Sequence, residues 1–355
     1  MRILIDIGHP GHVHLFRPFA KAMLEKGHAV LFTCREKEFE IELLKSAGFD
    51  FISFGKKFKS TIGKVLGLIK FDFLEIKAAL KFKPDIFLSH GSPYAAHAAF
   101  FLRKINIALE DTGNKEQVRI YMPFTKAVLT GESFQGNYGN KQIKYKGFHE
   151  LAYLHPNRFQ PNAEILKELG LKEGDVFFIL RFISWDASHD VGEKGLTSEE
   201  KLDIVKFLNK LGRVIISSEK KLPAELETYA YNLHPSKIHD LMSFATLFIG
   251  EGATMASECA IIGTPSVYIN SMEAGTIDEQ EKYGLVYHFR NGFGVLEKIK
   301  ELVNDINLKK NAKLNSNKLI KDNIDVAAFL VWFIENYPQS EKIMKNNPDH
   351  QNKFK

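Results

Sequence analysis

The stretch "GEGATMASECAIIGTP" at residues 250–265 joins an apolar run, "ATLFI" at 245–249, to a segment with the composition of a helix. An apolar run, a glycine turn and a helix in this order form the basic unit of α/β proteins. Gly252, Ala253 and Thr254 stand at the start of that helix, where unpaired N–H groups and the helix dipole attract anions. The spacing therefore favours a phosphate or diphosphate site.

Glu258 lies about one turn into the same helix. A carboxylate there could hydrogen-bond the vicinal hydroxyls of a ribose whose phosphate sits at the helix start. An acidic side chain early in a helix also stabilises the helix through its dipole. Spacing alone leaves both interpretations open.

Buried-strand patterns alternate with helical segments along the chain and predict two doubly wound, Rossmann-like α/β domains that face each other across a cleft. The expected strands lie at 2–7, 29–34, 85–89, 106–110, 176–181, 213–218, 246–250 and 266–270, with a loop-rich stretch at 131–165 and second-half helices at 197–211 and 223–232. The predicted ranges are 1–148 for an acceptor domain, 149–325 for a nucleotide-sugar domain, 326–340 for a helix that crosses back, and 341–355 for a frayed tail.

Composition suits a folded chain of 355 residues with 45% hydrophobic residues. The start, "MRILIDIG", lacks the features of a signal peptide, and the apolar run at 326–334 is about half of the roughly 20 residues that span a bilayer. Cys34 and Cys259 are far apart and match no metal-site spacing, which suits a reducing compartment. We therefore expect a cytoplasmic protein.

The net charge of +5 favours anionic small molecules or an anionic surface over nucleic acid as partner. Residues 55–83 interleave lysines with apolar residues. This segment is either an amphipathic helix with solvated lysines or a patch that contacts the inner face of a membrane peripherally.

The first strand ends in a loop, "DIGHPGHVHLF" at 6–16, that is rich in glycine and histidine. Gly8 and Gly11 allow close approach of a ligand, and His12 at the following helix is a candidate general base. No metal is expected from His9, His12 and His14, because positions 12 and 14 do not share a helix face.

Two further strand ends carry polar residues. Glu110 and Asp111 stand at the end of the strand "NIALE" and are expected to point into the cleft, although Asp, Thr and Gly also favour plain turns. Arg181 ends the strand "VFFILR" and Ser184 follows it, and both could bind phosphate oxygens, whereas a strand-end salt bridge is the alternative for Arg181.

Residues 238–265 resemble the C-terminal motif of glycosyltransferases of the B fold, most closely the N-acetylglucosaminyltransferases that complete lipid II. The matching residues are Gly252, Ala253, Ser257, Glu258, Gly263 and Pro265. The resemblance implies that Glu258 holds the nucleotide ribose and that the backbone near Ile238 reads uracil. It also implies donor-sugar contacts from Asp278, Glu279 and Gln280.

The first half resembles the same enzymes through "GHPGHV", which makes His12 a base or diphosphate contact, although Ile7 and Pro10 replace two of the family's glycines. Residues 85–113 are similar to the UDP-N-acetylglucosamine 2-epimerases. Glu110 matches a functional glutamate of those enzymes, and Ser92 stands where they carry a catalytic aspartate.

Nearly the whole chain resembles the uncharacterised prokaryotic family called domain of unknown function 354. Its signatures match "DIGHPGHVHLF", "KGFHELAYLHPNRFQP" and "ILRFISWDASHD". This likeness supports the two-domain fold and implies no substrate.

Together these features predict a metal-independent glycosyltransferase that uses a nucleoside-diphosphate sugar, UDP-linked, in cell-surface polysaccharide or glycolipid synthesis, with no other cofactor. The diphosphate is expected between Gly252–Thr254 and the loop after Arg181, and His12 or Glu110 is expected to deprotonate an unknown acceptor, one candidate being lipid-linked. Three alternatives stay open: a 2-epimerase-like isomerase, a non-catalytic sugar-nucleotide binder, and a dinucleotide oxidoreductase, which Asn270 disfavours because an acidic ribose partner is missing there.

Overall fold

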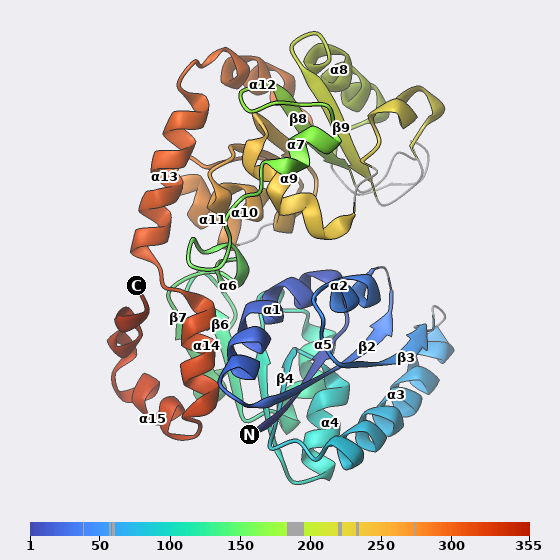
Figure 1. The fold of residues 1–355 in the computed structure, drawn as a ribbon, viewed down its shortest axis with the longest axis vertical. Coiled ribbons are helices and arrows are strands. Elements are labelled where there is room, and N and C mark those ends of the chain that lie inside the picture. The colour runs from blue at the N-terminus through green and yellow to red at the C-terminus, as the bar shows by residue number, and fades with distance from the viewer. Residues whose placement is uncertain are drawn as a thin grey trace. The chain divides into compact units, whose positions relative to one another are not determined.

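The computed structural model describes residues 1–37, 39–56, 58, 61–182, 195–218, 222–231, 234–272 and 275–355, with the backbone alone for 61–65. The chain forms two compact units (Figure 1). Unit 1 comprises Met1–Tyr153 and Ile324–Lys355, and unit 2 comprises Leu154–Asn323. The sequence analysis placed the boundaries at 148/149 and 325/326.

Unit 1 is built on a seven-stranded sheet in the order β3-β2-β1-β4-β5-β6-β7, in which all neighbours are parallel. Its strands are β1 Arg2–Ile7, β2 Ala29–Glu36, β3 Phe51–Lys56, β4 Ile86–His90, β5 Ile105–Leu109, β6 Ala127–Gly131 and β7 Gln142–Tyr145. Its helices are α1 Pro10–Glu25, α2 Glu40–Ser46, α3 Thr61–Phe82, α4 Pro93–Phe101, α5 Lys115–Tyr121, α14 Val326–Glu335 and α15 Gln339–Asn346, while α6 Leu151–Leu154 spans the boundary between the units.

Side chains alternate between the two faces of the β1 strand, and each face is covered by helices. Leu4 and Phe87 pack against α3 and α4 through Ala79, Ala95 and Ala99. Helix α1 packs with α2 and α14, and α4 also packs with α5. Pro10 at the first turn and the His9 side chain, which accepts a hydrogen bond from the Gly11 N–H, start α1 directly after β1.

Unit 2 contains a five-stranded parallel sheet in the order β12-β11-β10-β8-β9. Its strands are β8 Phe177–Phe182, β9 Arg213–Ser218, β10 Leu247–Gly250, β11 Ser266–Ile269 and β12 Val286–Phe289. Its helices are α7 Glu164–Glu168, α8 Ser198–Leu208, α9 Ile238–Phe244, α10 Ala253–Ile262, α11 Gly275–Lys282, α12 Val295–Asn304 and α13 Leu308–Asp322.

The predicted fold class is confirmed, because both halves are parallel α/β sheets and each expected strand is present within one or two residues. The sequence analysis missed β3, β6, β7 and β12. It was wrong about a helix at 223–232, where the structure has a 3₁₀ segment over Ala224–Tyr229. The chain leaves that segment because Ala230 bridges Ile216 and the Tyr231 N–H donates to the Ile216 carbonyl, which draws it along the edge of β9.

The expected frayed tail at 341–355 is also wrong. Helix α15 and a 3₁₀ helix over Pro348–Phe354 fold back onto unit 1. Gln351 is buried, and its side-chain oxygen accepts a hydrogen bond of 2.6 Å from the Lys146 N–H after β7. The polar composition of this segment concealed such single anchoring contacts. No helix in the described part of the chain is both long and apolar enough to cross a bilayer.

A buried ion pair ties the elements of unit 1 together at the carboxyl end of β1. Asp6 and Arg35 are 1% and 2% exposed, and the guanidinium binds both carboxylate oxygens, at 2.5 and 2.8 Å. The Ser92 hydroxyl at the start of α4 donates to the same carboxylate, and Thr33 Oγ1 lies 2.9 Å from it. Strands β1 and β2 and helix α4 thus share one charged centre.

Glu75 of α3 completes this centre and lies 3.1 Å from Thr33 Oγ1. Burial, together with the nearby Asp6 charge, raises the pKa of Glu75 well above its ordinary value, although Arg35 opposes the shift. Burial and the Asp6 charge thus favour the protonated form of Glu75, and Asp6 is the carboxylate that binds the Arg35 guanidinium.

We expect Asp6→Ala to lower the free energy of unfolding by about 3–5 kcal/mol, because it leaves the Arg35 charge buried without its partner. Glu75→Gln should cost less than about 1 kcal/mol, since burial favours the protonated form of Glu75 and the amide has the same shape and no charge. Urea unfolding followed by fluorescence measures both. Equal losses in the two variants would show that Glu75 is ionised in the folded protein.

Candidate functional site

The strand order of unit 1 reverses between β1 and β4, because the chain runs from β1 to β2 and β3 and returns to the other side of β1. Ligands of open α/β sheets bind at such a reversal, outside the carboxyl ends of the strands. The residues that follow β1, β4 and β5 therefore come together there. They include His12, His90 and Asp111.

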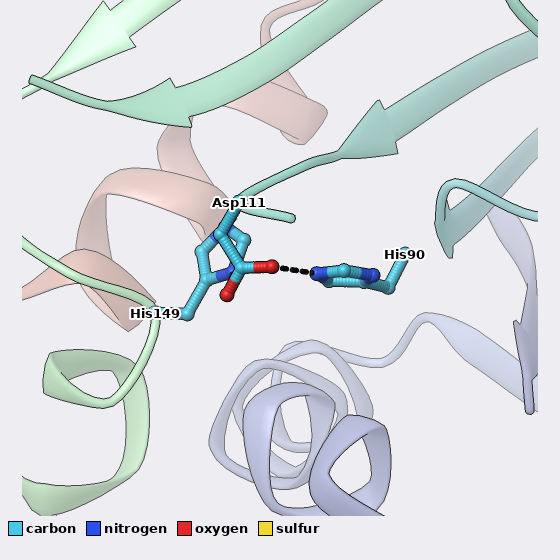
Figure 2. A group of neighbouring side chains, drawn as sticks. All are labelled: His90, Asp111 and His149. Atoms are coloured by element: carbon cyan, nitrogen blue, oxygen red, sulfur yellow. Dashed lines mark hydrogen bonds and ion pairs between the residues drawn. The ribbon is translucent and has the colours of Figure 1, made fainter. Parts of the chain in front are cut away.

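Asp111 lies between two histidines, as Figure 2 shows. Its two carboxylate oxygens bind His90 Nε2 at 2.8 Å and His149 Nδ1 at 3.0 Å. His90 ends β4, Asp111 follows β5, and His149 lies in the loop after β7. Because a carboxylate only accepts hydrogen bonds, both ring nitrogens carry a proton and donate it.

Charge on Asp111 dominates the electrostatics of this cluster. Burial by itself lowers the pKa of His90, but the charge and hydrogen bond of Asp111, with a smaller effect of Glu110, raise it to about 9. Burial alone would raise the pKa of Asp111, but the two histidines hold it well below its ordinary value. At neutral pH, His90 and Asp111 form an ion pair.

His149 has the geometry of a general base. Its Nδ1–H is held by Asp111, so the neutral ring carries a lone pair on Nε2. This Nε2 atom is buried and has no hydrogen-bond partner among the described residues. A carboxylate on one ring nitrogen and an acceptor on the other is the arrangement that lets histidine take a proton from a hydroxyl. The sequence analysis missed His149, which it quoted only within the signature at 146–161.

His12 stands in the first turn of α1 and stacks on His90, with ring centroids 4.5 Å apart. Its Nδ1 accepts the Gly8 N–H at 3.3 Å, so a neutral His12 carries its proton on Nε2. That form donates a hydrogen bond and is poorly suited to act as a base. The Gly11 N–H is bonded to His9 Nδ1 at 3.1 Å within the same turn.

Glu110 is buried and its carboxylate organises the loop after β5. Oε1 accepts hydrogen bonds of 2.8–2.9 Å from the Thr112 N–H and hydroxyl and from the Gly113 N–H, while Oε2 accepts one of 2.7 Å from the Tyr121 hydroxyl. Burial by itself raises the pKa of Glu110, but His90 and these donors lower it below its ordinary value. A low pKa and engaged oxygens make Glu110 a weak base in this geometry.

The cluster also has the composition of a metal site. One ligand atom from each of His90, Asp111 and His149 lies within 4.8 Å of the other two. The sequence analysis weighed a metal only on His9, His12 and His14, which are not in this group. The two hydrogen bonds to Asp111 already satisfy the facing atoms, so the geometry explains the cluster without a cation.

The sheet of unit 2 reverses between β8 and β10, where Arg181 pairs with Gly250. Arg181 is half-buried and its Nη1 donates to Ser217 Oγ at 3.0 Å. Ser184, the other expected phosphate ligand of this loop, lies outside the described residues.

Helix α10 starts at this reversal with little to block an anion. Gly252 precedes it and offers no side-chain cap, Ala253 is half-buried and Thr254 is exposed. Gly252 has φ −101°, which any residue can adopt, and a methyl group added there would meet no atom of the described residues within 4 Å. The start of α10 thus has no side-chain cap and has space beside Gly252 among the described residues, which suits a phosphate site.

Glu258 is buried one turn into α10, and its Oε1 lies 3.0 Å from His239 Nε2. His239 follows Ile238, the half-buried first residue of α9. This bond links Glu258, which the family resemblance assigns to the ribose, to the residue after Ile238, whose backbone it assigns to uracil. Glu258 therefore stands beside the start of α9 as well as behind the start of α10.

The expected donor-sugar residues lie on α11. Gln280 is fully buried and donates to Ser257 Oγ at 2.8 Å, and its side-chain oxygen has no partner among the described residues. Asp278 and Glu279 are half-buried, and Glu279 pairs with Lys282 at 2.7 Å. Gln280 is thus tied to the helix that carries Glu258.

The His90–Asp111 pair should make stability pH-dependent. Because folding raises the pKa of His90 from an unfolded value near 6.5 to about 9, its contribution is complete below about 6.5 and is lost as pH rises through about 9. We expect the melting temperature to fall over this range more steeply in the wild type than in His90→Gln. Parallel slopes would contradict the ion pair, and an NMR titration of the His90 ring gives its pKa directly.

Several solved structures have the same fold, and they are described as a complex with UDP, a 2-epimerase and a glycosyltransferase. The S. aureus protein MnaA, in a co-structure with UDP, is 12% identical with a TM-score of 0.67, covering 96% of this chain and 97% of that one. The UDP-GlcNAc 2-epimerase from Neisseria meningitidis bound to UDP-GlcNAc gives 12% and 0.62, over 91% and 99% of the chains. The spinosyn forosaminyltransferase SpnP gives 14% and 0.63, over 95% and 100%. The chain therefore has the fold shared by B-type glycosyltransferases and these epimerases.

The sequence comparisons also match most of the chain, and the descriptions of the matches name no activity. An uncharacterised protein of Methanocaldococcus jannaschii is 22% identical over 294 residues, which are 78% of this chain and 84% of that protein. The family described as "Protein of unknown function (DUF354)" matches residues 1–337. A match over nearly the full length shows that the chain belongs to the DUF354 family.

Proposed function

We propose that this protein is a glycosyltransferase that takes a UDP-linked sugar as donor and builds a cell-surface polysaccharide or glycolipid. The observation that carries the proposal is the start of α10, where a helix start without a side-chain cap, the space beside Gly252 and the buried Glu258 occur together. Structural neighbours described with UDP and UDP-GlcNAc support the choice of uridine.

In this proposal the donor binds to unit 2. The diphosphate accepts hydrogen bonds from the N–H groups at 253–255, where the helix dipole adds positive charge. Glu258 accepts hydrogen bonds from the ribose hydroxyls, and the backbone at Ile238 contacts the uracil. Arg181 neutralises charge that develops on the leaving diphosphate, so the departure of UDP needs no bound metal.

We assign the deprotonation of the acceptor to His149, in place of His12 or Glu110. In this assignment the acceptor hydroxyl transfers its proton to the lone pair of His149 Nε2. The imidazolium that forms is stabilised by Asp111, which holds the ring through Nδ1. His12, with a proton on Nε2, donates a hydrogen bond to the acceptor.

A 2-epimerase-like isomerase is the second candidate, because several structural neighbours have this name. The contacts at two positions argue against it. Ser92 occupies the position where the epimerases carry a catalytic aspartate, and its hydroxyl is hydrogen-bonded to Asp6. Glu110 accepts hydrogen bonds from its own loop and from the Tyr121 hydroxyl. An isomerase needs paired acid and base groups that these side chains do not offer.

Donor binding tests the first step. We expect Gly252→Val to weaken UDP binding by about tenfold or more, or about 1.4 kcal/mol, because its side chain fills the phosphate space. Glu258→Gln should weaken binding by a similar factor, since it keeps an acceptor for His239 and loses the charge toward the ribose. Calorimetry with UDP in EDTA measures both.

The control is Glu297→Gln, the same exchange at an exposed site in the first turn of α12, which should bind UDP like the wild type. Melting temperatures establish that each variant is folded. If folded Gly252→Val bound UDP with wild-type affinity, UDP would bind elsewhere and the start of α10 would no longer support the proposal.

Turnover tests the second step. With UDP-GlcNAc and a lipid extract as acceptor source, His149→Gln should lower the rate of UDP release by about 10²–10⁴-fold, because a general base contributes on this scale. UDP affinity should stay unchanged. Asp111→Asn should also slow UDP release, because the asparagine no longer fixes the His149 tautomer. His12→Gln should leave the acidic limb of the pH–rate profile unchanged, because that limb reports the general base, which is assigned to His149.

The same reactions distinguish the alternatives. Equal rates in His149→Gln and the wild type would remove His149 from the chemistry. Formation of an epimerised UDP-sugar without any acceptor would replace the transferase by the isomerase, and UDP binding with no turnover on any acceptor would leave a binding protein.

A further inference from the structure

Helix α3 carries an unusual solvent-facing surface. Within 66–82, where side chains are described, every exposed residue is either a large apolar residue or a lysine. We call this set the α3 face: Leu66, Ile69, Lys70, Phe73, Lys77, Leu80 and Lys81. The four apolar members are 57–66% exposed.

The α3 face runs along one side of the helix. Its members recur every three or four residues, the spacing that places side chains above one another on a helix. From Leu66 to Leu80 it extends over roughly 21 Å at about 1.5 Å per residue. The opposite side of α3 is buried in unit 1 through Phe71, Ala78 and Ala79.

Both acidic residues of α3 are turned away from this face. Glu75 is fully buried in the Asp6–Arg35 centre. Asp72 is half-buried and binds His97 Nδ1 of α4 at 2.9 Å. The α3 face therefore has positive charge only.

The neighbouring helix adds residues of the same kind. Helices α3 and α4 pack side by side (Figure 1). At the end of α4, Phe100 and Phe101 are 65% and 68% exposed, and Arg103 and Lys104 follow them, also exposed. Exposed large apolar residues and basic residues thus occur on α3 and at the end of α4.

A solvated helix surface does not require four large apolar side chains with this exposure. A second copy of the chain is also a poor occupant, because a two-fold interface would set the lysines of one copy against those of the other. Anionic lipid satisfies both kinds of side chain, since lysines bind headgroup phosphates and the apolar residues enter the boundary with the acyl chains.

We propose that the α3 face docks unit 1 onto an anionic membrane surface. Leu66, Ile69, Phe73 and Leu80 enter the headgroup region, and Lys70, Lys77 and Lys81 bind lipid phosphates. The protein attaches peripherally and reversibly. This proposal rests on the surface alone and does not depend on the donor site of unit 2.

Vesicle co-sedimentation tests the proposal with the full-length chain. Phosphatidylcholine vesicles with and without phosphatidylglycerol provide anionic and neutral surfaces. We expect at least about tenfold tighter binding to the anionic vesicles, with binding that weakens as salt screens the lysines. Binding to neither kind of vesicle would overturn the proposal.

Two double variants separate the contributions of the face. Ile69→Ser with Phe73→Ser removes apolar insertion, and Lys70→Glu with Lys77→Glu reverses charge. Each should reduce binding to anionic vesicles by about tenfold or more without lowering the melting temperature, since all four side chains are exposed. The matched control, Lys310→Glu with Leu314→Ser, alters an exposed lysine and an exposed apolar residue of α13 and should bind like the wild type.

The remaining outcomes also decide. Unchanged binding in both α3 variants would place the membrane contact elsewhere and overturn the proposal. A wild-type dimer that Phe73→Ser converts to a monomer, with no vesicle binding, would make the face an interface between copies. Calorimetry with UDP on the same variants is independent of vesicle binding, because it tests the proposed donor site of unit 2.

Discussion

The buried ion pair between Asp6 and Arg35 is the constraint on which unit 1 depends. A charged pair in a dry interior is stable only when its hydrogen bonds are satisfied, and here β2 and α4 supply those bonds, with α3 joined through Thr33 and Glu75. The pair therefore fixes these elements around the point where the strand order reverses. The α3 face depends on this centre, because Thr33 and the buried centre hold Glu75, an acid of α3, inside unit 1.

Glu110 and Asp111 are neighbours in the loop after β5, and they have different roles because different groups donate hydrogen bonds to them. Glu110 accepts hydrogen bonds from its own loop and from Tyr121, so its charge serves the loop structure. Asp111 is more exposed and accepts from two histidines of other segments, and its charge raises the pKa of His90. The difference between a structural and a chemical carboxylate arises from which donors the fold brings within reach.

The candidate donor site of unit 2 depends mainly on the backbone. A helix start without a side-chain cap, a glycine beside open space and one buried glutamate are its essential parts. Such a site constrains few side chains. The cluster of His90, Asp111 and His149 in unit 1 depends on specific side chains, and in the same unit Ser92 stands where the resemblance to the epimerases implies an aspartate.

The sequence by itself determined the two α/β halves, the helix start at Gly252 and the place of Glu258, because strand periodicity, glycine turns and helix ends are local properties. It could not determine the cluster of His90, Asp111 and His149, whose members are separated by up to 59 positions and meet only through strand order. It also misjudged the last 15 residues, since a polar segment is held by a few buried anchors such as Gln351. Tertiary structure decided these features because charge pairing and hydrogen-bond partners depend on contacts between distant segments.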